Sequence, residues 1–280
     1  MKNTLNIPTF LKWAGGKRRI LDTLDTLFPE TIERYFEPFL GGGSVFFYVK
    51  QKYNPDFSLI SDANADLVLT YQAVRDNPKG LLTALSRFKK RDSEEFYYQT
   101  REEFNLKALK GVERAAAFIY MNKTCYSGLF RVNSKNEFNV PYGRYKKAEV
   151  FSREVILEAS RLLQGVDIVH QDYREIVPHI SSGDFIYLDP CYDPIKRTSF
   201  VQYTPETFSE MDRINLADFV RSLQARGGKV LLSNNDIKKV RNLYPGFEYH
   251  RILAPRSLGA SVGADASIIE LAIRNYASSV

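Results

Sequence analysis

The chain has 280 residues, of which 44% are hydrophobic and 26% charged, proportions typical of a folded globular protein rather than a disordered one. No stretch approaches the ~20 consecutive apolar residues of a membrane span, and residues 1–13 lack the apolar core of a signal peptide, so we expect a cytoplasmic protein. Lys and Arg outnumber Asp and Glu by 39 to 33, giving a net charge of +6, which suits a polyanionic partner without establishing one. Two cysteines and three isolated histidines predict neither a disulfide framework nor a metal centre.

The first quarter of the chain has the pattern of the first half of a doubly wound α/β sheet. A glycine-containing loop over 13–17 precedes apolar residues at helical spacing that continue to residue 29. A short strand over 34–40 then stops at three glycines, and a helix follows them. The next apolar run, 57–61, predicts a second strand. A strand, a glycine turn, a helix and a strand in this order are the elements with which a doubly wound α/β sheet begins.

The middle of the chain is helical, and α/β character returns after it. Helices are predicted over 65–111 with a break at Asn77-Pro78, over 112–123 and over 153–163. Residues 126–145 predict a loop with a short hairpin around 133–136. Further strands are predicted at 166–169, 184–188, 229–233, 247–254 and 267–275. We therefore expect a mixed sheet with helices on both faces, formed by 1–66 and 166–280, with 67–165 inserted as a mainly helical lobe that carries the hairpin.

Two features follow the first two predicted strands, where an open α/β sheet binds its ligands. The turn Gly41-Gly42-Gly43-Ser44 does not match the Walker pattern, and Phe46 stands where the dinucleotide fingerprint requires a third glycine. The glycines would still let a nucleoside-bearing ligand approach the backbone. Asp62, 21 residues after Gly41, stands where an acid commonly binds ribose hydroxyls. A tight turn and a helix cap explain the same residues equally well.

The tetrad Asp189-Pro190-Cys191-Tyr192 follows another predicted strand. The Asp189 carboxylate and the Pro190 carbonyl offer two acceptors for the hydrogens of an exocyclic amine, which would favour a more tetrahedral nitrogen in the transition state. Tyr192 would stack on the base. The tetrad therefore indicates group transfer to a nucleobase amine. A turn capped by Asp189 is the structural alternative, and a nucleophilic Cys191 is disfavoured because no histidine lies near it in the sequence.

The segment from 126 to 150 concentrates basic residues, which indicates either nucleic-acid binding or a solvated face. Its charged residues are Arg131, Lys135, Arg144, Lys146 and Lys147 against Glu137 and Glu149. Aromatic residues make up 13% of the chain, and flat rings are what unstacked bases pack on.

Six segments, taken together and in this order, resemble the Dam-type (D12, or alpha class) DNA adenine-N6 methyltransferases, which use S-adenosylmethionine (AdoMet). They are FLKWAGGK at 10–17, YFEPFLGGG at 35–43, DAN at 62–64, GLFR at 128–131, FNVPYGRY at 138–145 and DPCY at 189–192. The likeness runs over nearly the whole chain. It implies the AdoMet-dependent methyltransferase fold, with residues 67–165 as the target-recognition domain that binds DNA.

The resemblance also implies roles for single residues. Trp13 and Lys17 would touch the cofactor, Asp62 its ribose and Asp172 its adenine. The full cofactor set is Trp13, Lys17, Phe36, Gly41, Gly43, Asp62, Asp172, Tyr173 and Asp189, and the catalytic set is Asp189, Pro190 and Tyr192. The product would be S-adenosylhomocysteine, and no metal is expected.

The remaining positions would bind double-stranded DNA. They are Lys12, Tyr126, Ser127, Leu129, Arg131, Asn133, Pro141 and Arg144. Arg131 matches the arginine with which family members read the outer guanine of GATC, and Tyr126 matches the aromatic residue that they insert into the stack. An arginine bidentate to guanine is the commonest specific base contact. Two residues depart from the family pattern: Cys191 replaces the usual second proline of the tetrad, and Ser127 stands where relatives often carry Asn.

The sequence thus predicts a monomeric bacterial, archaeal or phage enzyme that flips adenine out of duplex DNA, within GATC, and methylates N6 by direct transfer without a covalent enzyme intermediate. Two alternatives remain: a methyltransferase acting on RNA or a protein amide, and a sequence-specific DNA-binding protein of the same fold impaired in catalysis at Cys191. A restriction-modification, solitary or phage role is left open.

Overall fold

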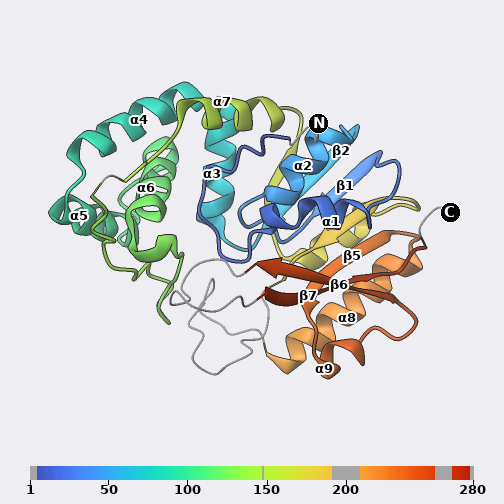
Figure 1. Cartoon of the computed structure of the whole chain (residues 1–280). Coiled ribbons are helices and arrows are strands. Elements are labelled where there is room, and N and C mark those ends of the chain that lie inside the picture. Colours follow the sequence, from blue (N-terminus) through green and yellow to red (C-terminus); the bar gives the residue numbers. More distant parts are fainter. Residues whose placement is uncertain (1–4, 147, 191–208, 256–266, 278–280) are drawn as a thin grey trace.

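The computed structural model describes residues 5–146, 148–190, 209–255 and 267–277, and these form a mixed sheet flanked by helices (Figure 1). The strand order is β3-β2-β1-β4-β5-β7-β6. The strands are β1 (Arg34–Glu37), β2 (Phe57–Asp62), β3 (Asp167–His170), β4 (Phe185–Leu188), β5 (Lys229–Asn235), β6 (Glu248–Pro255) and β7 (Ser267–Arg274). Strands β1 to β5 pair in parallel, whereas β7 is antiparallel to both β5 and β6. The predicted mixed α/β sheet is confirmed.

Helices connect most of the strands. They are η1 (Lys17–Arg19), α1 (Leu21–Asp25), α2 (Ser44–Lys52), α3 (Ala65–Asp76), α4 (Pro78–Arg91), α5 (Glu94–Asn105), α6 (Gly111–Thr124), η2 (Tyr126–Gly128), α7 (Arg153–Leu162), η3 (Tyr173–His179), α8 (Glu210–Ala225) and α9 (Lys238–Arg241). The predicted break between α3 and α4 is confirmed, because the Asn77 side chain caps α4 and Pro78 occupies its first turn. Strand β1 ends at Glu37, short of the predicted residue 40, since Pro38 has no N–H to donate to a neighbouring strand.

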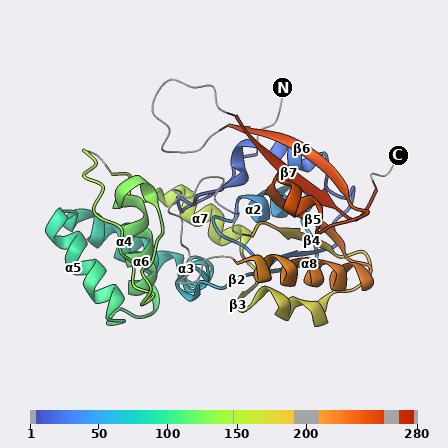
Figure 2. The ribbon, with the colours of Figure 1, turned by 90° about the horizontal axis from the view of Figure 1, so that it is seen from below.

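Side chains alternate between the two faces of the sheet, so each face has its own apolar core. On β4, Phe185 and Tyr187 pack into the cluster that contains α2 and the middle helices, whereas Ile186 and Leu188 pack into the cluster under α8. Figure 2 shows the sheet between α2 on one side and α8 on the other. Because side chains alternate with period 2, Glu37 and Asp189 fall on the same face as Tyr187.

The strand order reverses between β1 and β4. From β1 the chain continues to β2 and β3 on one side, whereas β4 and β5 are added on the other. The register pairs Phe36 with Ile186, so the segments that follow these strands emerge side by side at one edge of the sheet. Such a switch point leaves a crevice beyond the carboxyl ends of the strands, which is where ligands of doubly wound sheets bind.

Helices α4, α5 and α6 pack together beside the sheet (Figure 1). Helix α3 joins the sheet to this group of helices, because it packs against β2 and β3 and also against α4 and α6. One apolar cluster extends without interruption from one face of the sheet into the helices α4, α5 and α6. Within the described ranges, no helix is long and apolar enough to cross a membrane.

Candidate active site at the carboxyl edge of the sheet

The turn after β1 requires its glycines. Gly41 and Gly43 have φ values of +49° and +66°, in the left-handed region that other residues rarely adopt. A β-carbon on Gly43 would lie 2.5 Å from Tyr71 Oη, and one on Gly41 would lie 2.8 Å from Trp13 Nε1. The turn therefore packs tightly between the Trp13 ring and Tyr71 and leads directly into α2. The predicted approach of a nucleoside to its backbone stays a prediction.

Asp62, at the end of β2, lies beside this turn. Its Oδ2 accepts a hydrogen bond from the Gly41 N–H at 3.1 Å, and its Oδ1 accepts one from the Asn64 N–H at 2.9 Å. Burial raises the pKa of the carboxyl, and the two backbone donors oppose that shift. The carboxylate is thus held in one orientation with lone pairs remaining, which is what binding of two ribose hydroxyls needs.

Asp189 follows β4 and forms an ion pair with Lys17. The Lys17 Nζ lies 2.9 Å from Asp189 Oδ2 and 3.6 Å from Glu270 Oε2, and it donates to the Gly15 carbonyl at 2.7 Å. The Lys17 side chain is 2% exposed, against 22% for Asp189. Lys17 is therefore turned inward, and it brings the loop of 13–17 and the end of β4 together.

A buried acid lies at the end of β1 behind this ion pair. Glu37 Oε2 accepts a hydrogen bond from Tyr35 Oη at 2.7 Å. Burial raises the pKa of Glu37 well above its usual range, and the nearby Asp189 carboxylate adds to the shift. The Glu37 carboxyl therefore holds its proton to higher pH than an exposed glutamate does, and it lies close to the Asp189 carboxylate that pairs with Lys17.

The raised pKa of Glu37 predicts a pH-dependent stability. Between its usual pKa of 4.5 and its raised value, the folded protein binds one more proton than the unfolded chain, so the free energy of unfolding falls as pH rises through that window. Glu37→Gln keeps an acceptor for Tyr35 and removes the proton. Urea unfolding at about pH 5 and about pH 8 should therefore show a smaller decline for the variant than for the wild type. Equal declines would contradict a raised pKa of Glu37.

Aromatic pairs border the crevice. Trp13 stacks on Phe130 with ring centroids 5.7 Å apart, and Phe39, two residues after β1, stacks on Tyr173 at 5.2 Å. The first pair joins the glycine turn to the segment predicted to read DNA. Phe36, in contrast, is fully buried in the core under α8, so its predicted cofactor contact stays a prediction.

Asp172 lies at the start of η3, beyond the end of β3. Its side chain accepts a hydrogen bond from the Arg174 N–H and pairs with the Arg174 guanidinium at 2.7 Å. This hydrogen-bonded guanidinium lowers the pKa of Asp172. Asp172 is therefore ionised and fixed in position, but its predicted contact to an adenine ring stays a prediction.

The segment after α6 gathers several of the predicted DNA contacts. The Lys12 N–H and C=O both bond to the Asn122 side chain at 2.8 Å, and the Tyr126 N–H donates to the Pro141 carbonyl at 2.8 Å. The Tyr126 side chain is 61% exposed. The structure thus places Lys12, Tyr126 and Pro141 together and presents an aromatic ring to solvent.

Ser127 and Gly128 follow Tyr126 in left-handed conformations. Ser127 has φ +57°, and a β-carbon on Gly128 would lie 2.4 Å from Lys12 Cδ. Asn adopts this backbone region more readily than Ser, so Ser127→Asn would relieve backbone strain here. Leu129, the next residue, is half-buried and its carbonyl accepts a contact from Cys125 Sγ.

The hairpin around 133–136 forms as expected. Arg131 Nε donates to Asn139 Oδ1 at 2.8 Å, so the arginine is held across the hairpin. Asn133 bonds to the Lys135 and Glu137 N–H groups and to the Glu137 carboxylate, so its side chain shapes the turn. Arg144 is exposed and pairs with Glu94 at 2.7 Å.

Two predicted residues, Cys191 and Tyr192, lie outside the described residues. Pro190 is buried next to Asp189. Glu37, Phe130 and Glu270 also lie at or near the site and were not among the predicted site residues. The single acid in the apolar run 267–273 is the sequence signal that points to the last of these.

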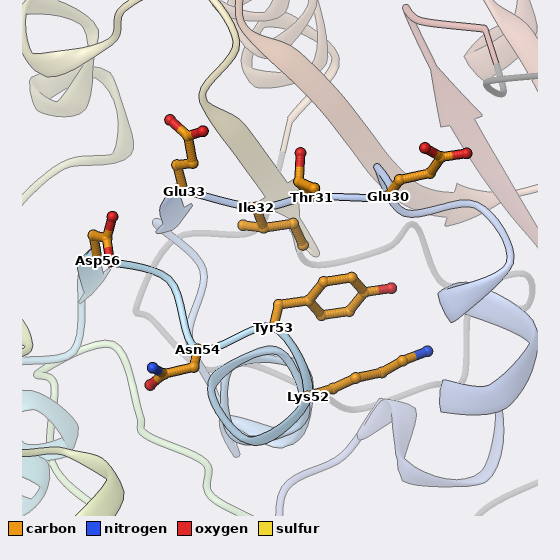
Figure 3. A pocket seen from close by; sticks show the side chains of 8 residues that line it. All are labelled: Glu30, Thr31, Ile32, Glu33, Lys52, Tyr53, Asn54 and Asp56. Carbon is orange, nitrogen blue, oxygen red and sulfur yellow. The ribbon is translucent and has the colours of Figure 1, made fainter.

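A hollow of about 380 Å³ lies at the opposite edge of the sheet, where β1 and β2 begin. Figure 3 shows the side chains of Ile32 and Tyr53 facing each other across it. It contains none of the predicted site residues. In the described part of the chain, no group of three or more His, Cys, Asp or Glu side chains is arranged to hold a metal ion.

Comparison with known proteins identifies the family. The family model of the D12 class N6 adenine-specific DNA methyltransferases matches residues 13–258. The chain is 40% identical to the type II methyltransferase M.MjaIII of Methanocaldococcus jannaschii, over 97% of this chain and 100% of the relative. It is 38% identical to the type II methyltransferase M1.LlaDCHI of Lactococcus lactis, with 98% of each covered. It is also 34% identical to the DNA adenine methylase of Escherichia coli K12, over 94% of this chain and 93% of the relative.

Proposed function

Because this chain belongs to the family of D12 class N6 adenine-specific DNA methyltransferases, we propose that it extrudes adenine from double-stranded DNA and methylates it beside Asp189. The chain is an enzyme that transfers a methyl group to adenine in DNA, and enzymes of this class use AdoMet. The observation that carries the proposal is the position of Asp189. It lies at the switch point between β1 and β4, paired with Lys17 and partly open to solvent.

The crevice fits a nucleoside cofactor. The glycine turn packs closely against Trp13 and Tyr71, and Asp62 offers a fixed carboxylate beside it. Gly41 and Asp62 would hold the ribose side of AdoMet, with Trp13, Lys17 and Tyr173 around them. When bound, AdoMet supplies a methyl group on a positively charged sulfur.

The chain's own residues would hold and polarise the adenine amine. The Asp189 carboxylate and the Pro190 carbonyl accept its two hydrogens, which draws the nitrogen lone pair out of conjugation with the ring. Extrusion costs a few kcal/mol of stacking and pairing, and an exposed aromatic ring such as Tyr126 can fill the space left in the duplex. No covalent bond between enzyme and base is needed, so positioning supplies most of the rate.

The helical lobe over 67–165 would select the target sequence, and GATC is the proposed site. Arg131 is the proposed reader of the outer guanine, and Lys12, Ser127, Leu129, Asn133, Pro141 and Arg144 would contact neighbouring bases or phosphates. The hydrogen bond from Arg131 to Asn139 supports this role, because it fixes the side chain before DNA binds. The enzyme would act as a monomer.

Arg131→Ala should relax discrimination at one guanine by about 1–3 kcal/mol. The measurement compares kcat/KM on a duplex containing GATC with kcat/KM on duplexes in which that guanine is replaced. Lys135→Ala, in the same hairpin but exposed at its turn, is the matched control. This variant should bind all duplexes more weakly by the same factor, and its DNA affinity should depend less on salt concentration than that of the wild type. Unchanged preference in the Arg131 variant would place the guanine contact elsewhere.

The proposed function is tested with isotopically labelled AdoMet and short duplexes. Label should enter adenine of a duplex that contains one GATC, and it should not enter the same duplex premethylated on both strands. Equal labelling of a duplex with GTTC in place of GATC would overturn the proposed target sequence. Failure of a fluorescent 2-aminopurine at the target position to brighten on binding would argue against extrusion.

A further inference from the structure

Glu270 occupies an unusual place in the sheet. It lies on β7, between Asn235 of β5 and Ile252 of β6. It faces the same side as Ala272, toward the core cluster that contains Tyr187. The surrounding strand is apolar, yet this position carries a carboxylate that is only 14% exposed. A buried acid of this kind is costly unless a charged or hydrogen-bonding partner stabilises it.

The partner that faces Glu270 is the Lys17 ammonium. Glu270 Oε2 is buried, makes no hydrogen bond to any described residue, and lies 3.6 Å from Lys17 Nζ. The other ionisable groups facing it are Asp189, 2.9 Å from the same ammonium, and Tyr187. Burial and the Asp189 carboxylate raise the pKa of Glu270, whereas Lys17 lowers it. One cation is therefore shared by two carboxylates.

The two distances differ in a way that matters for Asp189. Lys17 Nζ is closer to Asp189 than to Glu270, and a paired ammonium weakens the ability of a carboxylate to accept hydrogens from an amine. A displacement of Nζ by less than about 1 Å would bring it within hydrogen-bond distance of Glu270. The long, flexible lysine side chain makes such a displacement easy.

We propose that Glu270 is a positioning residue that offers a second ion-pair partner to the Lys17 ammonium, so that an Asp189 oxygen is released to bind the adenine amine. This inference rests on the proposed role of Asp189 in catalysis. Glu270 itself touches neither the base nor the reacting atoms, and it acts through the lysine. Its effect should appear in the rate of methyl transfer rather than in the affinity for DNA.

The test variant is Glu270→Gln, which has the same shape and no charge. Single-turnover methyl transfer should slow by about ten- to a hundred-fold, the size expected for loss of one interaction with a charged group. The KM for DNA should change by less than about twofold. The matched control, Glu248→Gln, removes an acid from the neighbouring strand β6 that pairs with Arg274, and it should transfer methyl groups at the wild-type rate.

Two further readouts separate positioning from a structural role. The wild-type rate should fall at low pH as Glu270 takes up a proton, and Glu270→Gln should lack this part of the profile. In a Lys17→Met background, Glu270→Gln should add little, because the two residues act as a unit. Additive effects would overturn the proposal, as would a pH profile identical to that of the wild type.

Two more variants complete the series. Glu270→Met, which fills the same volume without polar atoms, provides a second test if the glutamine variant does not fold. Asp189→Asn distinguishes failure of the proposed role of Glu270 from failure of the proposed role of Asp189. If it retains near wild-type activity, the proposed catalytic role of Asp189 fails. If it is inactive while folded Glu270 variants act at the wild-type rate, only the role of Glu270 fails.

Discussion

Asp189→Ala should abolish methyl transfer, and Asp189→Asn should lower its rate by about 100- to 1000-fold, while DNA binding is largely retained. The reason lies in the geometry at the switch point: the carboxylate directly follows β4, is partly exposed and pairs with Lys17, and it is the proposed acceptor for the adenine amine. An amide at this position offers a weaker acceptor and loses the ion pair with Lys17. The interaction lost is one that strengthens in the transition state.

Single-turnover transfer from labelled AdoMet measures the rate, and a mobility shift with the same duplex measures binding. Asp218→Asn, at an exposed position of α8 where Asp218 pairs with Arg221, is the matched control and should behave as the wild type. A variant lacking the Asp189 carboxylate that methylates DNA at near the wild-type rate would refute the assignment. Loss of DNA binding in parallel with activity would instead indicate a structural role.

Gly43→Ala should lower stability by about 2–5 kcal/mol and weaken AdoMet binding. A non-glycine residue at φ +66° costs about 1–2 kcal/mol in backbone strain. In addition, the new methyl group would lie 2.5 Å from Tyr71 Oη, and such overpacking costs about 1–3 kcal/mol. The displaced tyrosine would lose its hydrogen bond to the Gly41 carbonyl, which would disturb the turn that approaches the cofactor.

The chain offers a control that separates strain from collision. Gly165 has φ +72°, and a β-carbon there meets no atom within 4 Å, so Gly165→Ala should show the strain alone and leave AdoMet binding intact. Adding Tyr71→Phe to the Gly43 variant removes the colliding hydroxyl and should recover part of the loss. Stability is measured by urea unfolding, and AdoMet affinity by calorimetry. Equal losses in the two alanine variants would show that the contact with Tyr71 is unimportant.

Helices and strands could be predicted well where the apolar periodicity of the sequence was strong. Strand β2 and helices α3 and α6 have clear apolar patterns, and α3 also begins at an Asn64 cap. Their predicted positions are confirmed within a few residues. Helix α8 and the 3-10 helix η3 were not predicted. The long helical stretch also contains a second, unpredicted break, where Ser93 caps α5. It was not predicted because a capping serine inside a polar stretch cannot be told from other polar residues by sequence alone.

The two ends of the chain were expected to meet, but which side chains touch there was not evident. Lys17 and Glu270 are separated by most of the sequence, and their contact depends on β7 inserting between β5 and β6. Periodicity marks which face a strand residue takes, and it carries no information on strand order. The charge environment of Asp189 therefore required the assembled sheet.

Short motifs and local periodicity were enough to predict the class of fold, the glycine turn, the acids at the strand ends and the family. The sharing of Lys17 between Asp189 and Glu270, the burial of Glu37 and the stacking of Trp13 on Phe130 became evident only in the folded chain. Burial and the distance between charges set these properties, and both arise only when segments far apart in the chain pack together.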